Sequence, residues 1–168
     1  NTHPFQRELW GQYWIFAHNG DLKGLPPVSG EHYRPVGNTD SEHAFCLILE
    51  QLRQRFTVAP PLRDLSLALA EIVRRIAGYG VFNMMLSNGE WLFAHCATRL
   101  HYLVRQAPFA VAQLKDEDLS VDFSALTSPD DRVAVIVTEP LTANEDWRPM
   151  QPGELLCFRD GLPHAVIS

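Results

Sequence analysis

The chain has 168 residues, of which 46% are hydrophobic and 20% are charged, and this size suits one compact domain with a substantial core. The formal net charge of -6 argues against nucleic acid or an anionic membrane as the main partner. No uninterrupted apolar run approaches a membrane span, and the first residues are too polar for a signal peptide.

The cysteines and histidines are scattered. Cys46, Cys96 and Cys157 form no CxxC pair, and an odd number of separated cysteines favours reduced thiols. We therefore expect a cytoplasmic protein. The seven histidines show no HExxH or comparable spacing, so we predict neither a metal ion nor a cofactor.

The first two predicted elements are a packed loop and a buried strand. Residues 1–13 contain a proline turn followed by large apolar side chains, which we expect to pack the loop onto the core. The apolar, aromatic-rich run 14–17 is typical of a buried strand. His18, Asn19 and Gly20 then predict a tight corner, because Asn and Gly accept positive φ at low cost. In the predicted loop 1–13, the apolar side chains expected to pack onto the core are Leu9, Trp10 and Tyr13.

This predicted corner carries the first indication of chemistry. It would aim two hydrogen-bond donors at one point, the side-chain amide of Asn19 and the backbone N–H of Gly20. Paired donors fixed by a rigid strand are what an oxyanion hole requires. A simple strand-end turn explains the same dipeptide, and turns far outnumber oxyanion holes.

An irregular segment and two helices follow. Residues 21–38 are rich in glycine and proline, which predicts a mobile flap. Thr39 and Glu42 have the spacing of a capping box, which predicts a helix start and by itself explains Glu42. Two apolar stripes at helical spacing, separated by a proline pair, predict two antiparallel helices. The stripes are Phe45, Ile48, Leu49, Leu52 and Phe56, and then Leu65, Leu69, Ile72 and Ile76.

Strand patterns dominate from residue 81 onward. Segments 81–87 and 90–96 flank Asn88-Gly89 and predict a hairpin with a two-residue type I′ turn. Segment 133–138 is a continuous β-branched run, which predicts a strand buried on both faces. The whole order predicts an α+β layered fold in which the helix pair covers one face of a mostly antiparallel sheet. The remaining segments are a strand at 100–105, an acidic loop at 115–131, and a final hairpin of 155–158 with 165–167 around Asp160-Gly161.

Several separated motifs resemble one known family. The segments 1–4 (Asn-Thr-His-Pro), 18–20 (His-Asn-Gly) and 37–42 have the order and spacing of the class II glutamine amidotransferases, members of the N-terminal nucleophile hydrolase superfamily. The resemblance implies a four-layer αββα sandwich and a single type 2 glutamine amidotransferase domain over residues 1–168. Later segments look like the small stand-alone YafJ-type branch, and these are 81–87, 105–109, 140–145 and 152–154.

The resemblance also implies site residues. The family's oxyanion pair falls on Asn19 and Gly20, and its aspartate that binds the substrate's α-ammonium group falls on Asp40. Without the resemblance a structural role is the alternative for Asp40, since an acid in the first turn also suits the helix dipole. We expect structural roles for His3 and His18, and we expect the three cysteines to be buried.

The family's nucleophile is a cysteine at the mature N-terminus, and a family arginine that clamps the substrate carboxylate lies upstream of the Asn-Thr-His-Pro segment. Neither falls on a residue of this sequence, so we expect a segment ahead of Asn1. The implied activity is hydrolysis of the γ-amide of glutamine through a cysteine thioester. The alternatives are a γ-glutamyl peptide or conjugate hydrolase, and a catalytically silent amino-acid-binding or regulatory module. The implied partners are the small-molecule substrate and a separate ammonia-accepting enzyme.

Overall fold

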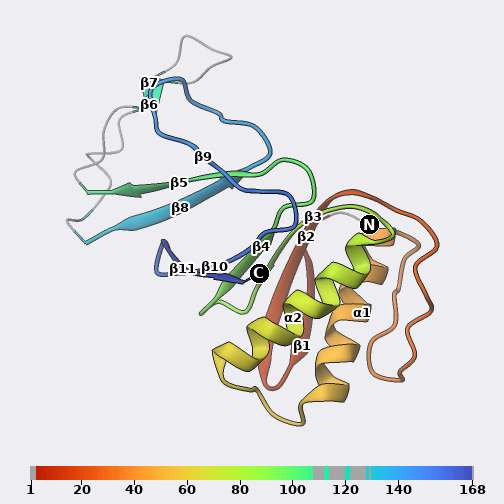
Figure 1. Ribbon diagram of the computed structural model, residues 1–168. Helices are drawn as coiled ribbons and strands as arrows, with labels where there is room; N and C mark the ends of the chain where they lie inside the picture. The colour runs from red at the N-terminus through yellow and green to blue at the C-terminus, as the bar shows by residue number, and fades with distance from the viewer. Residues whose placement is uncertain (1–2, 108–111, 114–119, 122–127, 129, 168) are drawn as a thin grey trace.

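Two helices lie against one face of an antiparallel sheet (Figure 1). The computed structural model describes residues 3–107, 112–113, 120–121, 128 and 130–167. Its helices are α1 (Asp40–Arg55) and α2 (Leu62–Ala77). Its strands are β1 (Phe5–Leu9), β2 (Gln12–Leu22), β3 (Gly80–Ser87), β4 (Leu92–His95), β5 (His101–Gln106), β6 (Ala112–Gln113), β7 (Ser120–Val121), β8 (Arg132–Val137), β9 (Arg148–Pro149), β10 (Leu155–Arg159) and β11 (Leu162–Ile167).

The strands form three sheets. The largest has the order β1-β2-β3-β4-β10-β11, a second has the order β8-β5-β9, and β6 pairs with β7. Every pairing between the described strands is antiparallel. This arrangement confirms the predicted α+β class, the mostly antiparallel sheets and the helix pair on one face.

The helix pair begins and packs as the sequence predicts. The hydroxyl oxygen of Thr39 accepts the backbone N–H of Glu42 at 3.3 Å and so caps the start of α1. The predicted stripes of both helices are buried, except that Phe56 is half-buried at the end of α1. The ring of Phe16 stacks on that of Phe45 with centroids 5.1 Å apart, which fixes α1 over β2.

The second sheet packs on the opposite face of the large sheet. Tyr102 of β5 contacts Phe158 of β10 edge to face, with ring centroids 5.4 Å apart. Ala134 and Ile136 of β8 pack against the same apolar cluster. The described residues thus supply three layers of the predicted four-layer sandwich: the helix pair, the large sheet and the small sheet. A second helix layer does not occur among them.

Residues 3–13 differ from the loop predicted over 1–13. They contain β1, which pairs with residues 12–16 of β2, and the turn between the strands is formed by Trp10 and Gly11 at φ 57° and 77°. Tyr13 is 67% exposed and does not pack onto the core. Because β1 has only five residues, with buried side chains at its two ends, its alternation is too short to be recognised in the sequence.

One predicted hairpin is confirmed and another needs a correction. The loop between β3 and β4 has four residues, 88–91, so the predicted two-residue turn is wrong. The side-chain oxygen of Asn88 accepts the N–H groups of Glu90 and Trp91 at 3.2 and 2.8 Å, and these bonds hold the wider loop. The final hairpin forms from β10 and β11 and turns at the predicted Asp-Gly pair.

Strand β8 is less buried than predicted. Val133 is 48% exposed, and the following residues of the strand are only half-buried. The prediction of a strand buried on both faces is therefore wrong, because β8 belongs to a sheet of three strands that packs on the large sheet by one face. The predicted acidic loop 115–131 lies mostly outside the described residues.

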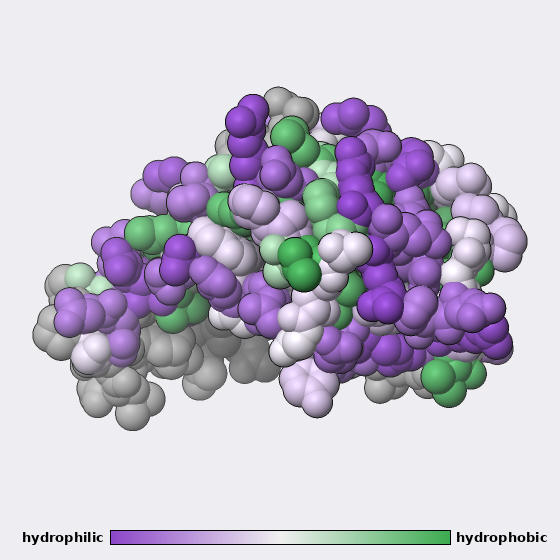
Figure 2. Space-filling view, turned by 90° about the horizontal axis from the view of Figure 1, so that it is seen from below, coloured by the Kyte–Doolittle hydropathy of each residue, from purple (hydrophilic) through white to green (hydrophobic). Residues whose placement is uncertain are grey.

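The surface is mainly hydrophilic on the face shown in Figure 2, where hydrophobic residues form small scattered groups. This agrees with the net charge of -6. In the part of the chain that the structure describes, neither helix combines the length and the hydrophobicity needed to cross a membrane.

Candidate functional site

The predicted corner after residue 17 does not exist, and β2 runs straight through it. Asn19 and Gly20 lie inside the strand and pair with Asn83 and Phe82 of β3. A Cβ on Gly20 would overlap the carbonyl oxygen of Val81. The Asn-Gly dipeptide therefore allows a close approach of two backbones within the sheet, not a turn.

Beyond residue 16, one edge of β2 has no pairing with β1. The register between the two strands ends at Phe5 and Phe16. On the other side, the N–H of Lys23 donates to the Tyr79 carbonyl at 3.0 Å, in register with β3. Because alternate residues of a strand bond to opposite neighbours, the N–H groups of even-numbered residues from 18 to 22 point to the edge away from β3. We call this stretch the open edge of β2.

Asp40 lies at this open edge. Its Oδ2 accepts the N–H of Leu22 at 2.8 Å, and its Oδ1 accepts the N–H of Ser41 at 2.8 Å. The Thr39 cap places Asp40 as the first residue of α1, where the helix dipole favours a carboxylate. The N–H of Gly20 points to the same edge two residues earlier, about 7 Å away along the strand at roughly 3.4 Å per residue.

Asn19 projects from the other face of β2. Successive side chains of a strand alternate, and the neighbouring His18 is buried beneath the helices whereas Asn19 is exposed. The structure thus places the Gly20 N–H and the Asp40 carboxylate at one edge. Among the described contacts, none joins the side-chain amide of Asn19 to either group, so its part in an oxyanion hole stays a prediction.

His18 connects the open edge to α1 and β3. Its Nε2 lies 3.0 Å from the Val81 carbonyl oxygen, and its Nδ1 lies 2.9 Å from Oγ of Ser41. Because a carbonyl oxygen can only accept, Nε2 carries a hydrogen and donates it to Val81. The Ser41 hydroxyl also lies 3.4 Å from Oδ1 of Asp40, to which it donates. The prediction that His18 is a hydrogen-bonded strand residue is confirmed.

His3 lies close to this group of residues. Its ring contacts that of Phe5 edge to face, with centroids 5.0 Å apart. Burial and the neighbouring His18 lower the pKa of His3, while the charge of Asp40 acts in the opposite direction. The start of the described chain therefore passes beside the open edge of β2.

The loop 23–39 closes the other side of Asp40. A pocket of about 340 Å³ lies between this loop and the start of α1, with Leu22, Asp40 and His43 among its lining residues. Nε2 of His43 donates to the Pro26 carbonyl at 2.9 Å and holds the loop against α1. Neither residue of the predicted oxyanion pair is among the described residues that line this pocket.

Buried acids of α1 anchor the same loop, which is packed where the sequence predicts a mobile flap. The Glu42 carboxylate accepts the N–H groups of Val36 and Gly37 at 3.1 and 2.7 Å and pairs with Arg7. The interpretation that a capping box fully explains Glu42 is therefore wrong. Glu50 likewise accepts a loop N–H, that of residue 33, at 3.2 Å. For both Glu42 and Glu50, the available sequence signal is an acidic residue on the buried face of an amphipathic helix.

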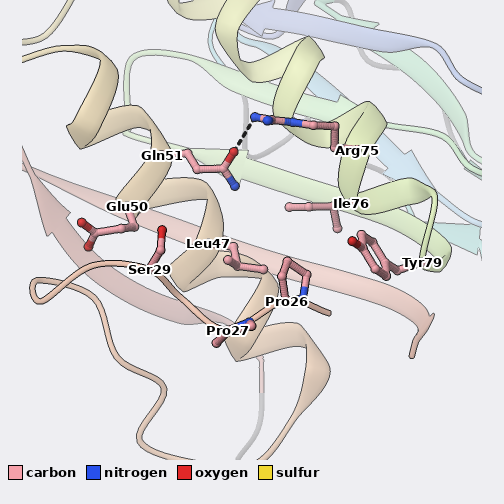
Figure 3. A pocket seen from close by; sticks show the side chains of 9 residues that line it. All are labelled: Pro26, Pro27, Ser29, Leu47, Glu50, Gln51, Arg75, Ile76 and Tyr79. Carbon is pink, nitrogen blue, oxygen red and sulfur yellow. Dashed lines mark hydrogen bonds between the residues drawn. The ribbon is translucent and has the colours of Figure 1, made fainter. Parts of the chain in front are cut away.

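A second pocket, of about 400 Å³, lies between the loop 23–39, α1 and α2 (Figure 3). Its charged side chains do not converge on one point. The guanidinium of Arg75 reaches toward Gln51, to which it donates, whereas the carboxylate of Glu50 points away from both side chains (Figure 3). None of the predicted site residues lines this pocket, so we place the candidate site at the open edge of β2 instead.

The three cysteines are buried, as predicted, and are not bonded to one another. Burial raises the pKa of Cys46 and of Cys157 to about 11, and it also raises the pKa of Cys96. Thiols in this state are poor nucleophiles at neutral pH. Among the described residues, no group of three His, Cys, Asp or Glu side chains is placed to hold a metal ion.

Comparison with known proteins identifies the family. The family model for class II glutamine amidotransferases matches residues 1–168, and the chain belongs to this family. A candidate glutamine amidotransferase of Haemophilus influenzae is 47% identical over 167 residues, which cover 99% of this chain and 57% of the relative. The candidate glutamine amidotransferase YafJ of Escherichia coli is 48% identical over 159 residues, which cover 94% of this chain and 62% of the relative. The predicted YafJ-type resemblance is thereby confirmed.

A solved structure supports the same assignment. The crystal structure of a predicted glutamine amidotransferase from Pseudomonas aeruginosa matches with a TM-score of 0.88 and 50% identity, covering 98% of this chain and 65% of that one. The chain thus spans about three fifths of the length of these relatives.

Proposed function

We propose that the protein hydrolyses the γ-amide of glutamine to glutamate and ammonia. The thiolate of an N-terminal cysteine, ahead of Asn1 in the whole protein, attacks the amide carbon. The C–N bond breaks, ammonia leaves with a proton supplied through the cysteine's own α-amine, and water then hydrolyses the thioester to glutamate and the free thiol. Membership of the class II glutamine amidotransferases supports this reaction class.

One observation carries the proposal: the Gly20 N–H and the Asp40 carboxylate share the open edge of β2. In an extended glutamine molecule the α-nitrogen and the amide oxygen are roughly 5–6 Å apart, from bond lengths near 1.5 Å. This distance is close to the spacing of about 7 Å between the Leu22 and Gly20 N–H groups along the strand. Glutamine is therefore long enough for its ammonium group to bind Asp40 while its amide oxygen reaches Gly20. The Asn19 amide is the second donor to the oxyanion that forms when the thiolate attacks.

The hydrogen bonds of Asp40 leave it able to bind an ammonium group. Leu22 and Ser41 each donate to a different oxygen of the carboxylate. Oδ1 also accepts the Ser41 hydroxyl at 3.4 Å, whereas Oδ2 accepts only the Leu22 N–H among the described contacts and keeps a further lone pair. A charge-assisted bond from an ammonium group to this oxygen is stronger than a neutral one. These two backbone donors also fix the direction of the carboxylate before the substrate arrives.

A glutaminase assay on the full-length gene product tests the proposal. Asp40→Asn should raise KM for glutamine about 10-fold to 100-fold, because a hydrogen bond to a charged group is worth about 1.5–3 kcal/mol. Asp64→Asn is the matched control, since Asp64 also lies in the first turn of a helix but on α2, and it should leave KM unchanged.

The outcomes separate the alternatives. Turnover of γ-glutamyl-p-nitroanilide without turnover of glutamine would indicate a γ-glutamyl conjugate hydrolase. Binding of glutamine with no hydrolysis, by a protein that carries its N-terminal cysteine, would indicate a silent amino-acid-binding module and would refute the enzyme. We further propose a cytoplasmic location, a separate enzyme as the ammonia acceptor, and residues 1–168 as part of a single catalytic domain.

A further inference from the structure

Asn83 is a buried polar side chain beside the candidate site. It is 5% exposed and is the register partner of Asn19. Directly opposite residues of antiparallel strands project from the same face, so the two asparagines lie side by side on the face turned away from the helices. A buried primary amide carries two N–H donors and one oxygen with two lone pairs, and each of these needs a partner.

All four positions are filled. Nδ2 of Asn83 donates to the Asn19 carbonyl oxygen at 3.2 Å and to Oγ1 of Thr98 at 3.0 Å. Oδ1 accepts the backbone N–H groups of Ala97 and Thr98 at 2.9 and 3.1 Å. Because these two N–H groups can only donate, the nitrogen and oxygen of the amide are unambiguously placed. The side chain thus joins β2 to the turn after β4.

The bond to Asn19 has a consequence for the next residue. The carbonyl of Asn19 and the N–H of Gly20 belong to one planar trans peptide unit, in which they point in opposite directions. Holding the carbonyl toward β3 therefore holds the Gly20 N–H toward the open edge, where Asp40 lies. A hydrogen bond to the carbonyl also polarises the peptide and strengthens its N–H as a donor, by roughly 10–30%.

We propose that Asn83 is the positioning residue of the oxyanion hole. Its side chain adds a second donor to the Asn19 carbonyl and so reinforces the direction that the β2–β3 pairing gives to the Gly20 N–H, without touching the substrate. This inference rests on the proposed function, in which the Gly20 N–H stabilises the oxyanion. An aspartate at position 83 would still accept from Ala97 and Thr98, but its side chain would have no donor for the Asn19 carbonyl, which would keep only the backbone N–H of the β2–β3 pairing.

Asn83→Asp in the full-length gene product is the test. We expect kcat for glutamine to fall about 10-fold to 100-fold, since misplacing one oxyanion donor is costly, while KM changes less than about threefold because Asp40 is untouched. Asn88→Asp is the matched control, because Asn88 lies in the β3–β4 loop and its Nδ2 donates to Gln12. An unchanged kcat in a folded Asn83→Asp enzyme would overturn the proposal.

A second readout is independent of activity. In ¹H–¹⁵N NMR spectra, Asn83→Asp should move the Gly20 amide signal and speed its hydrogen exchange, whereas Asn88→Asp should leave both unchanged. If the wild-type protein hydrolyses no γ-glutamyl substrate, the proposed function fails, and the Gly20 signal still decides whether Asn83 orients this peptide. Should Asn83→Asp not fold, Thr98→Val removes one partner of Nδ2 and should move the same signal. A Gly20 signal that stays in place in a folded variant overturns the inference.

Discussion

Replacing Gly20 by alanine tests how closely β2 and β3 approach each other at the candidate site. The new Cβ would overlap the Val81 carbonyl oxygen, and it would lie 2.6 Å from the Val81 carbonyl carbon and 2.8 Å from Nε2 of His18. The carbonyl is backbone and the imidazole is held by its two hydrogen bonds, so neither can move aside freely. The two strands must separate to admit the methyl group.

Overpacking costs about 1–3 kcal/mol, and the upper end applies here because the overlap is with backbone. For a chain of this size 1 kcal/mol corresponds to about 2–4 °C, so Gly20→Ala should lower Tm by about 6–12 °C. Gly78→Ala is the control: Gly78 has φ -67° and its added Cβ would lie 3.2 Å from the nearest atom. The free energy of unfolding of Gly78→Ala should stay within about 1 kcal/mol of the wild-type value. Thermal unfolding followed by circular dichroism measures both. Equal Tm values for the two variants would mean that β2 and β3 have room for a methyl group at position 20.

Two further predictions concern buried groups. Glu42→Gln should lower the free energy of unfolding by about 2–4 kcal/mol, because the carboxylate accepts two loop N–H groups and pairs with Arg7. Urea denaturation measures this, and an equal loss in the exposed Glu71→Gln would contradict it. Cys46 and Cys157 should resist a thiol reagent at pH 8 in the native state, since burial raises the pKa of each from 9.0 to about 11. With the folded pKa raised, the stabilisation from the protonated thiols is present below about pH 9 and is lost as the pH rises toward 11. Rapid native labelling in mapped peptides at pH 8 would contradict this.

The helices could be predicted from the sequence because their signals are local. The Thr39 cap and the two apolar stripes lie within a few turns of the residues that they organise. The assignment of Asp40 to a substrate site came from the family resemblance. Its bond to Leu22 depends on β2 and α1 meeting in space, which no local pattern indicates.

The wrong predictions share a physical cause. Asn19-Gly20 has the composition of a turn, but its glycine is required by a carbonyl 61 positions further along the chain, on β3. Glu42 has the spacing of a capping residue, yet its side chain bonds a loop that folds back over α1. Asn83 has no role among the sequence predictions, although an asparagine within the apolar run 81–86 is an available signal. In each case a tertiary contact decides what the residue does.

We propose that Gly20 and Asp40 bind the same substrate molecule at the open edge of β2. Titration of the full-length gene product with L-glutamine, followed by ¹H–¹⁵N NMR, tests it most directly. The amide signals of Gly20 and Leu22 should move together, and Asp40→Asn should abolish both shifts at the same glutamine concentrations. Shifts confined to the pocket between α1 and α2, lined by Glu50 and Tyr79, would contradict it.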